Sequence, residues 1–192
     1  MQFSARDVVL TALFAALTVV AAVMINIIGP VVPFSLVPFV VLLAGILLGP
    51  RLAALSMLVY ALLGLIGLPV FERPPFGGPG YVLQPTFGFI LGYIAAAYVT
   101  GILAGQGQKK AFFRYFAASV AGVAVLYLCG LPYLYVVLNY YMGKGFSAWQ
   151  VIQIGFIPFI IWDIIKAAAA AGLAGAVLQR LPGFKQRPGS VK

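Results

Sequence analysis

The sequence predicts an all-α integral membrane protein: a bundle of six transmembrane helices with outward-facing loops over a ligand pocket. Of its 192 residues, 64% are hydrophobic and only 8% are charged, whereas soluble domains carry about 25% charged residues. The apolar residues also fall into six segments, each near the length of about 20 residues that spans a bilayer. A chain of this length fits one compact bundle, so we expect a single domain over residues 1–192.

Prolines, glycines and charged residues separate the six expected spans. The first follows Arg6 and Asp7, and it is longer than the apolar core of a cleaved signal peptide. The second is interrupted by Pro33 and Pro38, so its start is expected to be irregular. In chain order, the expected spans are residues 8–28, 32–48, 52–68, 85–104, 112–135 or a little beyond, and 151–178.

The basic residues predict the orientation of the bundle. Six spans place both termini on one side, and every basic residue outside the spans then falls on that side except Arg73 and Lys144. Because cytoplasmic loops are enriched in Lys and Arg, we expect both termini in the cytoplasm, in a multi-pass protein of the plasma membrane. The basic tail of about residues 180–192 belongs to this side. The net charge of +9 thus reflects membrane topology, and no nucleic-acid partner is expected.

The polar residues exclude several kinds of site. The chain has no histidine, a single cysteine, and only Asp7, Glu72 and Asp163 as acids. We therefore expect no metal site, no internal disulfide, no cofactor and no catalytic site. No GxxxxGK[ST] phosphate loop occurs. If the protein takes part in energy-driven transport, the energy must come from another protein.

Asp163 and Lys166 are charged residues deep within an apolar segment, FIPFIIWDIIKAAAAAGLAG. A charge at bilayer depth costs roughly 2.5–3.5 kcal/mol on insertion scales and usually marks a binding site or pathway. Positions i and i+3 share a helix face. A purely structural ion pair is the alternative, but such pairs add little stability when buried. The pair suits a urea or amide N–H donor together with an acceptor or carboxylate, and Lys166 could bind either end.

Further candidate ligand-binding residues lie near the outer ends of the spans. The Pro/Gly-rich loop of residues 69–85 could be a lid or an ordinary packed loop, and the earlier outward loop could close the other side. An aromatic-rich segment near residue 140 fits an interfacial belt but could also reach the pocket. The candidates besides the charged pair are Gln84, Thr86, Phe34, Trp162, Tyr135 and Asn139.

Small residues recur at four-residue spacing in three spans, which allows helices to approach closely. Gly88, Gly92 and Ala96 in the fourth span favour packing within the bundle, and so does a similar series in the sixth. Ala12 and Ala16 in the first span could instead contact a separate membrane protein.

Four segments together resemble the BioY family, the biotin-specific S components of energy-coupling-factor (ECF) vitamin transporters. They are ARDVVLTALFAALT, LLAGILLGPRLAALSMLVYALLGLIGLPVF, PTFGFILGYIAAAY and WDIIK, and the resemblance runs over about residues 5–180. It implies a six-helix S component that captures biotin from outside. It also implies partners: a transmembrane coupling protein and two cytosolic ATPase subunits.

The resemblance also implies roles for particular residues. Asp163 and Lys166 match the family's biotin-binding acid and lysine, and Ala12 and Ala16 match its AxxxA docking pattern. The stretch Glu72-Arg73-Pro74-Pro75 departs from the glycine-rich pattern usual at this position. The runner-up is an S component for thiamine or riboflavin. An intramembrane enzyme lacks a second carboxylate or histidine near Asp163.

Overall fold

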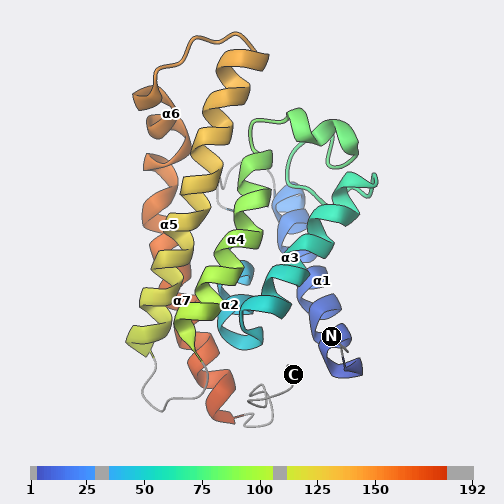
Figure 1. Ribbon diagram of the computed structural model, residues 1–192, viewed down its shortest axis with the longest axis vertical. Coiled ribbons are helices and arrows are strands. Elements are labelled where there is room, and N and C mark those ends of the chain that lie inside the picture. The colour runs from blue at the N-terminus through green and yellow to red at the C-terminus, as the bar shows by residue number, and fades with distance from the viewer. Residues whose placement is uncertain (1–3, 29–34, 106–111, 181–192) are drawn as a thin grey trace.

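The computed structural model describes residues 4–28, 35–105 and 112–180, and all regular elements within these residues are helical. The start of α1 and the end of α7 lie toward one end of the long axis (Figure 1). The 66–86 segment and the 142–147 loop lie toward the other. In chain order the elements are α1 (Ala5–Ile28), α2 (Val37–Leu48), α3 (Pro50–Leu65), η1 (Pro79–Leu83), α4 (Phe87–Ala104), α5 (Phe112–Val136), η2 (Val137–Tyr141), α6 (Ala148–Gly155) and α7 (Ile157–Arg180).

Four of the described helical segments are long and apolar enough to cross a membrane: Ala5–Met24, Phe87–Ala104, Phe112–Tyr141 and Ile157–Arg180. Helices α2 and α3 have only 12 and 16 residues. At 1.5 Å per residue they rise about 18 and 24 Å, less than the bilayer's apolar core of about 30 Å. The structure therefore does not confirm six full-length spans. The expected start of the second span, at residues 32–34, lies outside the described residues.

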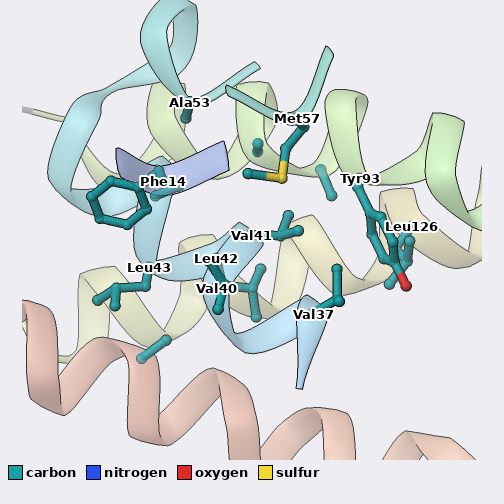
Figure 2. Close-up of a cluster of buried hydrophobic side chains, with 14 of the residues drawn as sticks. Phe14, Val37, Val40, Val41, Leu42, Leu43, Ala53, Met57, Tyr93 and Leu126 are labelled. Atoms are coloured by element: carbon teal, nitrogen blue, oxygen red, sulfur yellow. The ribbon is translucent and has the colours of Figure 1, made fainter. Parts of the chain in front are cut away.

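Helix α2 lies at the centre of the bundle. Of its residues only Phe39 is not fully buried, and α2 contacts α1, α3, α4 and α7. Figure 2 shows Val37, Val41 and Leu42 of α2 among side chains from the surrounding helices. A helix that is apolar on every side belongs in a core. Because protein surrounds α2, it can be shorter than a lipid-exposed span.

The fifth expected span agrees with the prediction, since helix α5 continues through the π-turn η2 to Tyr141, a little beyond residue 135. The sixth span is not one helix, because it divides at Phe156 into α6 and α7. Pro158 explains the division: its ring has no N–H and would clash with the carbonyl of Ile154 in a continuous helix. In the first turn of α7, the same proline is well tolerated.

Glycines permit close helix contacts at two junctions. A Cβ at Gly88 would lie 2.2 Å from the Tyr133 Cβ, so α4 packs directly on α5. A Cβ at Gly101 would lie 2.4 Å from the backbone nitrogen of Pro50, where α2 turns into α3. In α7, Ala167 and Ala171 are fully buried, but a Cβ at Gly175 would meet nothing within 4 Å. The small-residue series of α7 therefore packs internally only in part.

The substitution Gly101→Ala is predicted to lower the thermal unfolding temperature of the detergent-purified protein by several degrees. The new methyl group would overlap the Pro50 backbone, which cannot move aside as a flexible side chain can. Gly175→Ala is the matched control: it makes the same change in a helix where space is open. Its unfolding temperature should stay the same or rise, since Ala favours helix over Gly by about 1 kcal/mol. Equal effects of the two substitutions would contradict the close contact.

Candidate functional site: a charged cavity between the helices

A cavity of about 680 Å³ lies inside the bundle. Its walls come from α3, α4, α5, α6 and α7, from the start of α2, and from the segment between α3 and α4. The lining is mixed, with tyrosine hydroxyls and four charged side chains beside phenylalanine and leucine side chains. A pocket of this size and character can hold a small molecule with an apolar body and a polar end.

Asp163 and Lys166 form an ion pair in this cavity. The Lys166 Nζ donates to Asp163 Oδ1 at 2.7 Å. The Tyr127 hydroxyl donates to Asp163 Oδ2 at 2.5 Å. Asp163 is only 4% exposed, so its charge is removed from water and must be compensated by these two donors. The division at Phe156 places the pair about two turns into α7 rather than at the midpoint of a long helix.

The trio can bind further polar groups. Each carboxylate oxygen can accept a second hydrogen bond, and the ammonium group of Lys166 has two more donors. Phe159 and Leu126 line the same cavity and provide apolar contact. The arrangement suits a compact group that carries both N–H donors and an oxygen acceptor, attached to an apolar body.

Glu72 forms a second polar group in the cavity. Its Oε1 accepts a short hydrogen bond from the Ser35 hydroxyl. The Ser35 Oγ in turn accepts from the backbone N–H of Val37 at 3.0 Å, at the start of α2. Burial raises the pKa of the Glu72 carboxyl, and the Ser35 hydrogen bond and the charges of Lys166 and Arg73 oppose this rise. Glu72 therefore ties the segment between α3 and α4 to the beginning of α2.

The segment between α3 and α4 is anchored by Phe71. The Phe71 side chain is fully buried, and its ring packs edge-on against Tyr60 at 5.6 Å and tilted against Tyr81 at 4.3 Å. The Phe71 N–H donates to the carbonyl of Phe76, and the Phe76 N–H donates to that of Arg73. The sequence left two interpretations for the 69–85 loop, a lid or an ordinary packed loop. The segment is packed on the bundle, and it also lines the cavity.

The structure places only some of the candidate residues at the cavity. Asp163, Lys166, Gln84 and Thr86 line it. Trp162 does not, because one step along the helix turns it away from Asp163 and leaves it 44% exposed. That these residues bind a ligand stays a prediction.

The two candidates at the end of α5 lie away from the cavity. Tyr135 packs in a small apolar cluster with Leu134 and Val151. The side-chain amide of Asn139 donates to the Phe146 carbonyl at 2.9 Å and so supports the next loop. Phe34 lies outside the described residues.

Several polar residues of the cavity were not singled out as ligand-binding candidates in the sequence, and Tyr127 and Arg73 are the two that matter most for the argument. Tyr127 is one of many aromatic residues, and no local pattern pairs it with a carboxylate 36 residues later. Arg73 stood out as one of two basic residues on the outward side and as part of a departure from a glycine-rich stretch, but not as a ligand-binding residue. A search for hydroxyl and charged residues near the ends of spans could have suggested Arg73, but Tyr127 required the packing of α5 against α7.

Comparison with known proteins identifies the family. The sequence matches the BioY family over residues 1–183. The chain belongs to the BioY family. The match covers nearly all of the chain, so it confirms the resemblance carried by the four segments above.

Individual relatives agree. A probable biotin transporter BioY of Lysinibacillus sphaericus is 42% identical over 173 residues, which is 90% of this chain and 87% of the relative. The biotin transporter BioY of Thermotoga maritima is 38% identical over 169 residues, with 88% and 94% of the two chains covered. Both relatives are named as transporters, not enzymes.

A solved structure shares the fold. The crystal structure of the S-component for biotin from an ECF-type ABC transporter superimposes with a TM-score of 0.73, covering 93% of this chain and 95% of that one. Sequence identity is 19%, so the similarity concerns the arrangement of the helices. The BioY chain described here thus has the S-component fold.

Replacing Lys166 by Met is predicted to destabilise the ligand-free protein, because it leaves the buried Asp163 carboxylate without its cation. Adding Asp163→Asn to Lys166→Met should recover part of the loss, since the unpaired charge is then gone. Thermal unfolding of the wild type, both single variants and the double variant in detergent measures this coupling. Strictly additive changes in unfolding temperature would show that the pair is not coupled.

Proposed function

We propose that this BioY chain is the substrate-binding S component of a biotin uptake system. The observation that carries the proposal is the buried Asp163–Lys166 pair at a cavity of about 680 Å³. The biotin transporters among its relatives, similar over most of their length, support the choice of ligand. Nothing in the cavity favours thiamine or riboflavin over biotin.

Biotin has the chemistry that the cavity can satisfy. Its ureido ring presents N–H donors and a carbonyl acceptor, its sulfur-containing ring is apolar, and its side chain ends in a carboxylate. In the proposed complex, Asp163 accepts from a ureido N–H and Lys166 donates to the ureido oxygen. Hydrogen bonds to charged groups contribute about 1.5–3 kcal/mol each, and the nearby aromatic side chains contact the apolar ring.

The proposed orientation places the cavity toward the outside of the cell. Helices α1 and α5 begin and α7 ends toward the same end of the bundle (Figure 1). These helix ends carry Arg6, Arg114 and Arg180, which fits a cytoplasmic face. The 66–86 segment, which carries Arg73, and the 142–147 loop, which carries Lys144, lie toward the opposite end. In this proposal six helical segments traverse the membrane, with the short α2 and α3 enclosed or partly enclosed by the longer helices. The sixth segment consists of α6 and α7.

Transport requires other proteins in this proposal. The partners would be a transmembrane coupling protein and two ATPase subunits, because the sequence has no phosphate-binding loop of its own. Ala12 and Ala16 are exposed on α1, whereas Thr11, Phe14 and Ala15 face the bundle. A strip of exposed small residues lets another transmembrane helix approach closely, so we assign this strip to the coupling protein.

The substitution Asp163→Asn is predicted to weaken biotin binding at least about tenfold, because a neutral amide accepts a ureido N–H less strongly than a carboxylate does. Titration calorimetry on the purified protein, freed of bound ligand, measures the affinity. Trp162→Phe is the control, since this neighbour on α7 does not line the cavity, and its affinity should match the wild type. Thiamine and riboflavin, titrated in parallel, should give no heat. Unchanged biotin affinity in Asp163→Asn would refute the assignment.

Larger side chains at Ala12 and Ala16 of α1 are predicted to prevent binding of the coupling protein without affecting the binding of biotin. Ala12→Leu combined with Ala16→Leu should abolish co-purification with the coupling protein while leaving biotin affinity unchanged, because neither residue lines the cavity. Ala169→Leu on the exposed side of α7 is the matched control and should co-purify normally. Normal complex formation by the double variant would place the coupling surface elsewhere.

A further inference from the structure

Arg73 differs from the other charged residues of the cavity. Asp163 and Lys166 bind each other, and Glu72 binds Ser35. Among the residues that the structure describes, the Arg73 guanidinium has no hydrogen bond or ion pair, although it lines the cavity. It is also exposed. A cation in this position is available to an anionic group that enters the cavity.

The neighbouring acid does not neutralise Arg73. Glu72 is the residue next to it, yet the Glu72 carboxylate lies against the Ser35 hydroxyl at the start of α2. The N-terminus of a helix favours a negative charge, which helps to hold Glu72 there. Glu72 influences Arg73 only electrostatically, without an ion pair. This arrangement leaves the guanidinium free to bind elsewhere.

The backbone that carries Arg73 is well held. Phe71 is buried two residues before it, and the Arg73 carbonyl accepts from the Phe76 N–H at 2.7 Å. Glu72 adds the tie to Ser35. Such support on both sides fixes where the Arg73 side chain begins, so no ordering of the backbone is needed when the guanidinium binds a ligand.

We propose that Arg73 binds the carboxylate of the ligand at the cavity and thereby selects the free acid over its neutral esters and amides. This inference rests on the proposed function and refines it. The Asp163–Lys166 pair is formally neutral and complements a neutral ureido head. Arg73 is then the cation left for the other end of the molecule. A guanidinium matches a carboxylate with two parallel hydrogen bonds.

The test compares biotin with biotin methyl ester, which differs only at the acid end. The wild type should bind biotin at least about tenfold more tightly than the ester, as expected for a charge-assisted hydrogen bond. Arg73→Gln should bind both with similar affinity, at the level of the wild type with the ester. Calorimetry at low salt measures all four affinities. The wild-type preference should also shrink as salt is added, because Arg73 is exposed to solvent.

Lys144→Gln is the matched control. Lys144 belongs to the 142–147 loop, which lies toward the same end of the bundle as the segment that carries Arg73 (Figure 1). The substitution removes the same net charge, but Lys144 does not line the cavity. It should keep the full preference for the acid. A preference that survives in Arg73→Gln, or that Lys144→Gln reduces equally, would overturn the role of Arg73. If the wild type binds neither compound, the proposed function itself fails, so the two failures are distinguishable.

Discussion

The pairing of Asp163 is the interaction on which the site depends. A carboxylate at this depth is stable only if donors replace the water that it has lost. Lys166 supplies one donor from the same helix, and Tyr127 supplies the other from α5. This requirement ties the polar end of the cavity to the packing of α5 against α7, which are in extensive contact. The donor that completes the site therefore comes from a neighbouring helix.

Helix α2 provides the other constraint. Because it is buried on nearly every side, the longer helices pack around it and need not pack only on one another. Its start, with Ser35, receives the Glu72 carboxylate from the segment between α3 and α4. The start of the central helix α2 is therefore in contact with the segment between α3 and α4 that lines the cavity. A change at the start of α2 would alter the cavity as well as the packing.

The distribution of charge in the cavity has a simple logic. Two acids and two bases line it, but they are not arranged as two ion pairs. Asp163 and Lys166 form one ion pair, while Glu72 accepts a hydrogen bond from a hydroxyl. The Arg73 guanidinium makes no hydrogen bond or ion pair with a described residue. A neutral polar group can thus bind at the Asp163–Lys166 ion pair. The Arg73 guanidinium gives an anionic group a different place to bind.

The sequence by itself determined the all-helical membrane class, the approximate positions of most helical segments, and that Asp163 and Lys166 are charges on one face of an apolar helix. These depend on local information: hydrophobic length, helix periodicity and the cost of an intramembrane charge. Only the tertiary structure decided that Tyr127 completes the pair, that Trp162 and Asn139 lie away from the cavity, and that Arg73 lines it. Those outcomes depend on how helices distant in sequence rotate and pack against each other. The division at Phe156 could have been predicted from Pro158, because proline interrupts a helix. The length of the apolar segment led instead to the prediction of one continuous span.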